Sequence, residues 1–162
     1  MESLNDCIKE YTVQLQKGQI QKAYKGIMSF MSELKNDMQS KYPAYVSSAL
    51  YFGYMDMTYF AFTPFTLKKR KFKIAVVYLH EENKLEVWLG GSNRRIQAEY
   101  IALLQNKDIG DYALSQMKPG LDSIVAWTLV HQPDFDQADE VKEIVERNVI
   151  AFANRMVSIL GE

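Results

Sequence analysis

The spacing of apolar residues changes near Pro43, and this change constrains the fold more than any other feature of the sequence. Before Pro43, apolar side chains recur every three or four residues, which is the period of an α-helix. After it, residues 72–89 alternate between two kinds of side chain, which is the period of a β-strand. Helices followed by hairpin-joined strands and then by further helices are typical of an α+β domain.

Two helices are predicted for residues 1–40. Ser3 is a suitable N-cap, and Gly18 can adopt the left-handed conformation that ends a helix. The first apolar stripe consists of Leu4, Cys7, Ile8, Tyr11 and Leu15. The second consists of Ile20, Tyr24, Ile27, Met28, Met31, Leu34 and Met38. With a short joint between them and Pro43 after them, the two helices are expected to form a helical hairpin.

Antiparallel strands are predicted within residues 45–90. The aromatic-rich region 45–62 suits a strand that Pro64 closes, and residues 72–80 and 85–89 suit a hairpin. If Glu82 and Asn83 form a two-residue turn, then Tyr78 faces Val87, Val77 faces Trp88 and Val76 faces Leu89. One face then carries Phe72, Ile74, Val76, Tyr78, Leu85, Val87 and Leu89. The other face is mixed and carries Lys73, Ala75, Val77, Leu79, Glu86 and Trp88.

The rest of the chain completes a single domain over residues 1–162. A helix is predicted for residues 94–105, and residues 107–121 are expected to be irregular, with a short strand at 112–117 before Pro119-Gly120. Residues 122–131 could form a strand or a helix, and their Val, Ile, Thr and Trp content favours a strand. Asp136 is expected to cap a long C-terminal helix, 136–160. We therefore expect an α+β fold with three to five antiparallel strands and helices packed on one face of the sheet.

Composition limits the class of protein. The formal net charge of −1 argues against a nucleic-acid or membrane-surface partner, and no apolar run approaches the ~18 residues of a membrane span. Cys7 is the single cysteine, so an internal disulfide and a cysteine-based zinc site are excluded. The polar N-terminus lacks the features of a secretory signal. A cytoplasmic protein is expected.

Several sequence blocks carry a resemblance to a known family. They are Lys17-Gly-Gln-Ile-Gln-Lys-Ala-Tyr-Lys-Gly-Ile-Met28, Tyr51-Phe-Gly-Tyr-Met-Asp-Met-Thr-Tyr-Phe60, Tyr78-Leu-His-Glu-Glu82 and Val87-Trp-Leu-Gly-Gly-Ser-Asn-Arg94. Through them the chain resembles a small family of bacterial single-domain proteins of unknown function. The resemblance covers nearly the whole chain and implies a stand-alone cytosolic protein. It brings no activity, cofactor or catalytic residue.

Motifs of known chemistry are mostly missing from the sequence. His80-Glu81 lacks the second histidine that a metalloprotease helix needs, and the acidic run from Asp134 lacks the glycine and glutamate of a calcium loop. No phosphate-binding loop, dinucleotide fingerprint or catalytic triad is found. The sequence therefore predicts no metal, no cofactor and no catalytic residues.

The junction between the hairpin and the helix at residue 94 is the first candidate site. Ser92 or Asn93 can cap the helix, and Arg94 and Arg95 lie in its first turn, where their charge opposes the helix dipole. Free backbone N–H groups and two guanidinium groups suit a phosphate or carboxylate. The alternative is that both arginines pair with acids such as Glu86 or Glu99 on a solvated surface.

The aromatic strand gives the second candidate site. Asp56 is expected in mid-strand beside Tyr54, where it could be a polar anchor in an aromatic pocket. The alternatives are a satisfied core carboxylate or a charge that protects an edge strand. Trp88, on the mixed face, is a candidate contact for a ligand or partner, although a helix could equally cover it.

These observations favour a non-enzymatic binding or interaction module for a small anionic ligand or a protein partner. One alternative is a hydrolase with a carboxylate-containing pocket formed by Asp56, Glu86 and His80, whose side chains would have to converge on one point. The other alternative is a dimerising structural protein.

Overall fold

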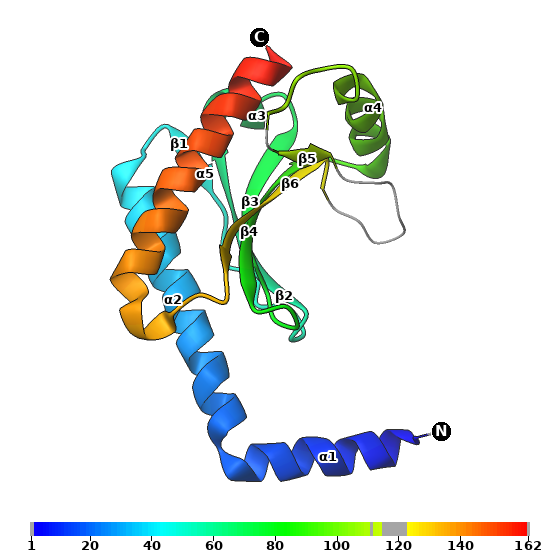
Figure 1. Cartoon of the computed structure of the whole chain (residues 1–162), viewed down its shortest axis with the longest axis vertical. Coiled ribbons are helices and arrows are strands. Elements are labelled where there is room, and N and C mark those ends of the chain that lie inside the picture. Colours follow the sequence, from blue (N-terminus) through cyan, green and yellow to red (C-terminus); the bar gives the residue numbers. More distant parts are fainter. Residues whose placement is uncertain (1, 111, 115–122, 162) are drawn as a thin grey trace.

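The computed structural model describes residues 2–110, 112–114 and 123–161, and Figure 1 shows the arrangement of its elements. In chain order they are α1 (Leu4–Lys17), α2 (Gln19–Lys41), β1 (Tyr45–Ser47), β2 (Met57–Pro64), α3 (Phe65–Lys68), β3 (Phe72–Leu79), β4 (Lys84–Gly91), α4 (Arg94–Leu104), β5 (Ala113–Leu114), β6 (Val125–His131), the 3₁₀ helix η1 (Phe135–Gln137) and α5 (Ala138–Leu160). The predicted α+β class is confirmed.

The strands form one antiparallel sheet in the order β1-β2-β3-β4-β6-β5. The strand expected over 45–62 is divided, because residues 48–56 leave the sheet except for a single bridge between Tyr51 and Tyr59. Gly53 and Met55 both have positive φ in this segment. Such a backbone cannot continue a strand, so β1 and β2 are separate strands.

The central hairpin keeps the predicted faces but not the predicted register. Ile74 pairs with Leu89, Val76 with Val87 and Tyr78 with Leu85, a shift of two residues from the expected pairing. The shift arises because residues 80–83 all lie in the connection, with Asn83 at positive φ, instead of Glu82 and Asn83 alone. Since side chains alternate with a period of two, the shift leaves every residue on its predicted face.

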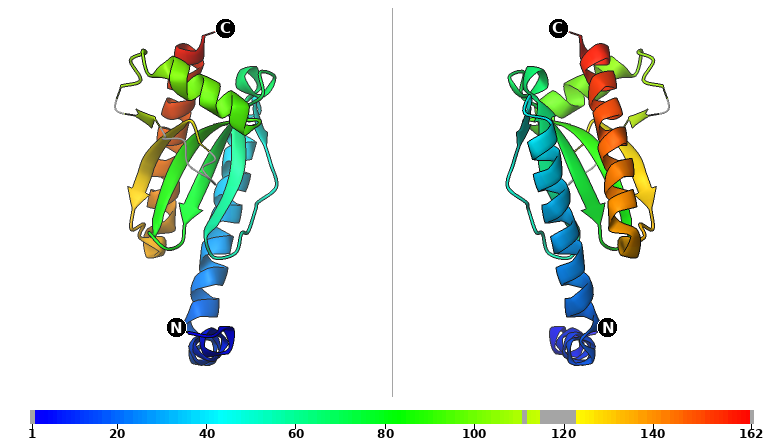
Figure 2. Two further views of the ribbon diagram at one scale, coloured as in Figure 1. Left: turned by 90° about the vertical axis from the view of Figure 1, so that its right-hand side faces the viewer. Right: turned by 90° about the vertical axis from the view of Figure 1, so that its left-hand side faces the viewer.

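The all-apolar face of the sheet forms the core. Helices α2 and α5 cover this face, as the right-hand view of Figure 2 shows. Side chains from both helices and from the sheet are fully buried there, among them Met31 and Leu34 from α2, Val149 and Phe152 from α5, and Phe60 from β2. At about 25 cal/mol per Å² of buried apolar surface, this single layer supplies most of the driving force for folding.

Helix α4 departs from the expectation that the helices share one face. Its first turn lies over the mixed face, and Figure 2 shows it across the upper end of the sheet, opposite α2 and α5. The cause is local. A Cβ atom built on Gly91 would lie 2.8 Å from the Ile96 side chain, so the absence of a side chain lets the helix approach the end of β4 closely.

The two N-terminal helices are confirmed, with the predicted caps. Ser3 and Asp6 form a capping box at the start of α1, and Gly18 has φ 83° at its end. However, α1 does not fold back along α2 as a hairpin would: Figure 1 shows it projecting from the lower end of α2, away from the sheet. No residue of α1 is buried.

The C-terminal elements follow the prediction with one correction. Residues 125–131 form strand β6, and β5 covers part of the expected short strand, of which residues 115–117 lie outside the described residues, as do Pro119 and Gly120. Asp136 is not the cap of α5. Asp134 accepts the backbone N–H of Asp136 at 3.1 Å and caps η1, and α5 then begins at Ala138. The capping residue therefore lies two positions earlier than predicted, because the 3₁₀ helix η1 precedes α5.

Candidate functional site

A pocket of about 280 Å³ lies on the mixed face, beneath the first turn of α4. We call it the α4 pocket. Its described lining residues are Met57, Tyr59, Lys73, Ala75, Val77, Trp88, Gly90, Gly91, Ser92, Asn93, Arg94 and Gln97. Strands β2, β3 and β4 therefore form its floor and α4 forms its wall. A concave site lined by aromatic side chains and a few polar groups is the usual form of a small-molecule pocket.

The wall of the α4 pocket depends on how α4 begins. The Oδ1 atom of Asn93 accepts the backbone N–H of Ile96 at 2.9 Å, which makes Asn93 the N-cap. Strand β4 ends with Gly90 and Gly91, and Asn93 follows two residues after Gly91. The positive end of the helix dipole thus lies at the pocket, where it favours a negatively charged group.

Trp88 in the floor is held by a buried carboxylate. The Glu86 side chain accepts the indole N–H of Trp88 at 2.7 Å through Oε1. Its other oxygen, Oε2, accepts the Thr128 hydroxyl at 3.3 Å and contacts Lys84 Nζ at 2.8 Å. Glu86 is only 9% exposed, so these partners compensate its burial. Glu82 and Glu86 together raise the pKa of Lys84.

Two basic residues line the pocket. The Nζ atom of Lys73 lies 5.3 Å from the centre of the Tyr59 ring, a cation–π distance. Within the described part of the chain, Lys73 forms no ion pair. Arg94 is the first residue of α4 and contributes a guanidinium group to the same pocket. An ammonium and a guanidinium beside aromatic rings suit an anion attached to a planar group.

The structure brings together some of the predicted site residues and separates others. Trp88, Ser92, Asn93 and Arg94 line the pocket, whereas Arg95 is exposed outside its described lining. Sequence reasoning missed further residues of the lining, chiefly Tyr59, Lys73, Met57 and Gln97. Lys73 could have been found, because the alternation of β3 already placed it on the face of Trp88.

Asp56 and Tyr54 lie away from this pocket, and the expected mid-strand position of Asp56 is wrong. Asp56 precedes β2 in a turn and is exposed, and Tyr54 is 89% exposed. The Asp56 carboxylate accepts the backbone N–H of Tyr54 at 2.9 Å, and this bond, followed by one from Met57, lowers the pKa of Asp56. A Cβ atom at Gly53 would collide with the Met57 carbonyl oxygen. Asp56 therefore stabilises a tight turn instead of anchoring an aromatic pocket.

The proposed hydrolase residues do not converge. The Thr58 hydroxyl donates to the Phe52 carbonyl at 2.7 Å, so at 2.8 Å it accepts a hydrogen bond from Nε2 of His80. Burial lowers the pKa of His80, and the nearby Asp56 carboxylate partly offsets this. Glu86 lies on the opposite, mixed face of the sheet, where its carboxylate accepts the indole N–H of Trp88. Because His80 and Glu86 lie on opposite sides of the sheet, the three groups cannot act on one substrate atom.

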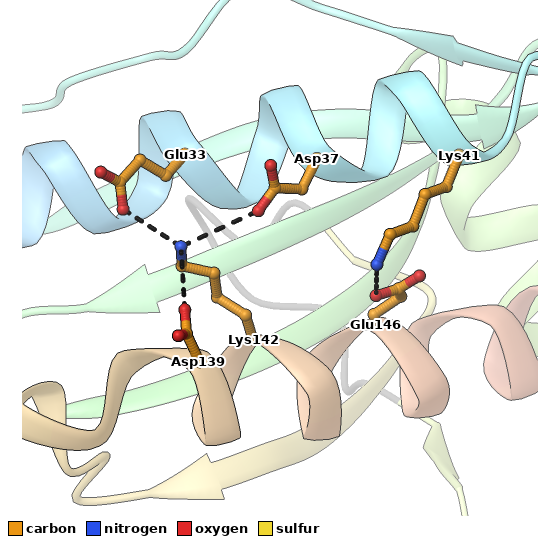
Figure 3. Close-up of polar contacts among 6 residues, drawn as sticks. All are labelled: Glu33, Asp37, Lys41, Asp139, Lys142 and Glu146. Carbon is orange, nitrogen blue, oxygen red and sulfur yellow. Dashed lines mark hydrogen bonds and ion pairs between the residues drawn. The ribbon is translucent and has the colours of Figure 1, made fainter.

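A second hollow, the α2–α5 groove, has a volume of about 620 Å³ and is lined by charged side chains of both helices. Figure 3 shows that Lys142 of α5 contacts three carboxylates, Glu33 at 3.1 Å and Asp37 and Asp139 at 3.8 Å each. Lys41 pairs with Glu146 at 3.0 Å. The hydrogen bond that Lys142 donates to Glu33 raises the pKa of Lys142. These charges join the two helices to each other.

Two searches of the described residues bear on the chemistry. No group of three or more histidine, cysteine, aspartate or glutamate side chains among them is placed to hold a metal ion. None of the helices in the ranges given above combines the length and apolar character that crossing a membrane requires.

Fold and pocket together define a small α+β domain with a mixed-polarity pocket at the junction of a strand and a helix. Residues 4–160 match the family described as a domain of unknown function (DUF7000), and the chain belongs to that family. The resemblance stated from the sequence, to a family of unknown function covering nearly the whole chain, is thus confirmed. Comparisons with curated proteins and with solved structures gave no match.

Proposed function

We propose that the protein is a non-enzymatic binding module that takes a small anionic ligand into the α4 pocket. The observation that carries the proposal is the position of Lys73, whose ammonium group lies over the Tyr59 ring at the pocket and forms no ion pair with the described residues. Arg94 and the start of α4 add positive potential at the same place. The ammonium charge of Lys73, which no described residue compensates by an ion pair, is therefore available to an anionic ligand.

The shape and size of the pocket limit the kinds of ligand that fit it. A volume of about 280 Å³ is at the small end of ligand pockets, so a single ring with one phosphate or carboxylate group fits better than a dinucleotide. Trp88 and Tyr59 offer aromatic surface to the ring. The net charge of −1 and this confined positive site favour a small molecule over a nucleic acid.

The hydrogen bonds and ion pair of Glu86, the acidic residue beneath the pocket, also support a binding module and not an enzyme. Glu86 beneath the pocket has both oxygens engaged by Trp88, Thr128 and Lys84, which leaves it poorly placed as a general base.

We further propose a reducing, cytoplasmic compartment, because the single cysteine, Cys7, is an exposed free thiol.

Calorimetric titration with phenyl phosphate, inorganic phosphate and uncharged phenol tests the proposal. We expect phenyl phosphate to bind more tightly than either fragment. Lys73→Ala should weaken its binding at least tenfold, because a charge-assisted contact contributes about 1.5–3 kcal/mol. The matched control is Lys68→Ala, which removes the same charge outside the described pocket lining and should leave binding unchanged. Equal weakening by both variants, or no binding of any of the probes, would contradict the proposal.

A further inference from the structure

Trp88 is the largest side chain in the lining of the α4 pocket, and its neighbours on the mixed face of the sheet are mostly small. Ala75 pairs with it on β3, and Ala126 pairs with it on β6. Gly90 follows it on the same face of β4. Two methyl groups and a hydrogen atom cannot cover an indole, and Trp88 is only half-buried. Part of its ring is therefore open to a molecule in the pocket.

The polar edge of this ring is already occupied. Glu86 is the remaining neighbour of Trp88 on this face of β4, and its Oε1 atom accepts the indole N–H at 2.7 Å. The indole N–H is the single hydrogen-bond donor of a tryptophan side chain, which has no acceptor. Trp88 therefore presents carbon surface to the pocket. Such a surface selects a ligand by the shape and electron density of its ring and not by a hydrogen bond.

The hydrogen bond to Glu86 also changes the electron density of the indole. Lys84 Nζ lies 2.7 Å from Glu82 and 2.8 Å from Glu86, so two carboxylates share one ammonium group and one negative charge remains. Glu86 is only 9% exposed, and a buried charge acts strongly on the group to which it is bonded. A carboxylate that accepts the indole N–H polarises the ring and makes its face more negative.

A negative ring face attracts either a cation or a ring that is poor in electrons. The lining of the α4 pocket decides between these two partners. Lys73 and Arg94 are basic, and the described lining contains no acidic side chain, so a cationic ligand would be repelled. An anionic group held by Lys73 would bring an attached ring close to Trp88, because Lys73 and Ala75 are successive residues on one face of β3 and Ala75 pairs with Trp88.

We propose that the α4 pocket takes an aromatic acid whose ring is poor in electrons, such as a pyridine or pyrimidine that carries a carboxylate or phosphate group, and that Glu86 sets this preference. This inference rests on the proposed function, because it names the class of ligand for the same pocket. Lys73 and Arg94 bind the acid group, and the ring lies against Trp88. Glu86 is outside the described lining, so it is a positioning residue that acts through the indole.

Two matched aryl phosphates test the preference by calorimetric titration at about pH 8, where both are dianions because the second pKa of such a phosphate is about 6. 4-(Trifluoromethyl)phenyl phosphate and 4-methylphenyl phosphate are similar in shape, but their substituents have opposite effects on the electron density of the ring. The wild-type chain should bind the trifluoromethyl compound at least about threefold more tightly. Equal binding, or tighter binding of the methyl compound, overturns this inference and leaves the proposed function intact. If neither compound binds, and phenyl phosphate does not bind either, both proposals fail.

Glu86→Gln separates the electronic effect from the greater hydrophobicity of the fluorinated compound. The glutamine oxygen can still accept the indole N–H, but the negative charge is lost, so the ratio of the two affinities should fall towards one. The matched control is Glu81→Gln, which removes the same charge from an exposed position between β3 and β4 and should keep the wild-type ratio. A ratio that is unchanged in Glu86→Gln, or that falls equally in both variants, overturns the role of Glu86.

Fluorescence tests whether the ring of the ligand lies against Trp88, and it requires no change at Glu86. Trp127→Phe leaves Trp88 as the single tryptophan of the chain. Saturation with the trifluoromethyl compound should quench the Trp88 emission, because an electron-poor ring in contact with an excited indole accepts charge from it. Inorganic phosphate is the matched control, since it supplies the acid group without a ring, and it should leave the emission unchanged. Calorimetric saturation without quenching, or equal quenching by inorganic phosphate, overturns the inference.

Discussion

The α4 pocket and the α2–α5 groove lie on opposite sides of one sheet, and they differ in how far their charged side chains are paired. In the larger α2–α5 groove, Lys142 contacts three carboxylates and Lys41 contacts a fourth. In the smaller α4 pocket, Lys73 contacts an aromatic ring and forms no ion pair with the described residues. Two of the three cations that line the larger hollow, Lys41 and Lys142, thus have carboxylate partners inside the chain, whereas Lys73 in the smaller one is available to a ligand.

This difference shows that volume is a weaker guide to a binding site than the degree of charge compensation. A groove whose charges neutralise one another attracts an external ion only weakly, because the ion would have to displace existing partners. A cation over an aromatic ring keeps most of its positive potential. We therefore expect the groove to contribute to stability and the pocket to contribute to binding.

The largest effect is expected at Glu86, a compensated charge beneath the pocket floor. Glu86→Ala removes the acceptor of the Trp88 indole N–H and of the Thr128 hydroxyl and leaves Lys84 without its more buried partner. The free energy of unfolding should fall by about 2 kcal/mol, since hydrogen bonds to a charged group contribute about 1.5–3 kcal/mol. Urea denaturation measures this loss.

Glu86→Gln serves as the control, because its amide oxygen can still accept the indole N–H, and it should lose less than Glu86→Ala. Equal losses for the two variants would mean that packing, and not the hydrogen bonds, makes Glu86 important.

A smaller effect separates the two hollows directly. Lys142→Met should lower the free energy of unfolding by about 0.5–1 kcal/mol, because three carboxylates lose their shared cation on a partly exposed surface. The same substitution at Lys73 should change stability by less than about 0.5 kcal/mol, as is usual for surface positions. Chemical denaturation at low and at high salt measures both, and salt should shrink the Lys142 effect alone. A loss at Lys73 as large as that at Lys142 would break the comparison.

Sequence periodicity was sufficient to predict the two faces of the central hairpin. The prediction survived a wrong register because a shift of two residues returns each side chain to its own face. The loop length could not be predicted, because a contact distant in sequence helps to fix Asn83: its carbonyl accepts the N–H of Gln132 at 2.9 Å, in addition to the local hydrogen bond of its side chain with the Tyr78 hydroxyl at 2.7 Å. Residues far apart in sequence decide where such a turn begins.

The sequence predicted only that part of the candidate site whose residues come from one local segment. Trp88 and the residues from Ser92 to Arg94 are close in sequence, so their proximity followed from the strand-to-helix junction. Tyr59 comes from β2, and its place beside Lys73 depends on strand order, which the sequence left open. The position of Asp56 was predicted wrongly because the strand propensity of its aromatic neighbours favoured a continuous strand, whereas Gly53 and Met55 have positive φ and form a turn.

The smallest effect concerns the pH dependence of the groove. The pKa of Lys142 is raised in the folded protein, chiefly by its hydrogen bond with Glu33, so the folded state holds this proton more tightly than the unfolded state. Its contribution to stability is therefore complete below the unfolded pKa of about 10.5 and is lost as the pH rises through the folded value. The stability difference between the wild-type chain and Lys142→Met should be constant near neutral pH and should shrink only as the pH rises from about 10.5 through the raised folded pKa. Because tyrosine ionisation affects both chains alike, the difference between their denaturation midpoints isolates Lys142. A difference that persists at the upper pH would mean that Lys142 stabilises α2 against α5 through the packing of its aliphatic stem and not through its charge.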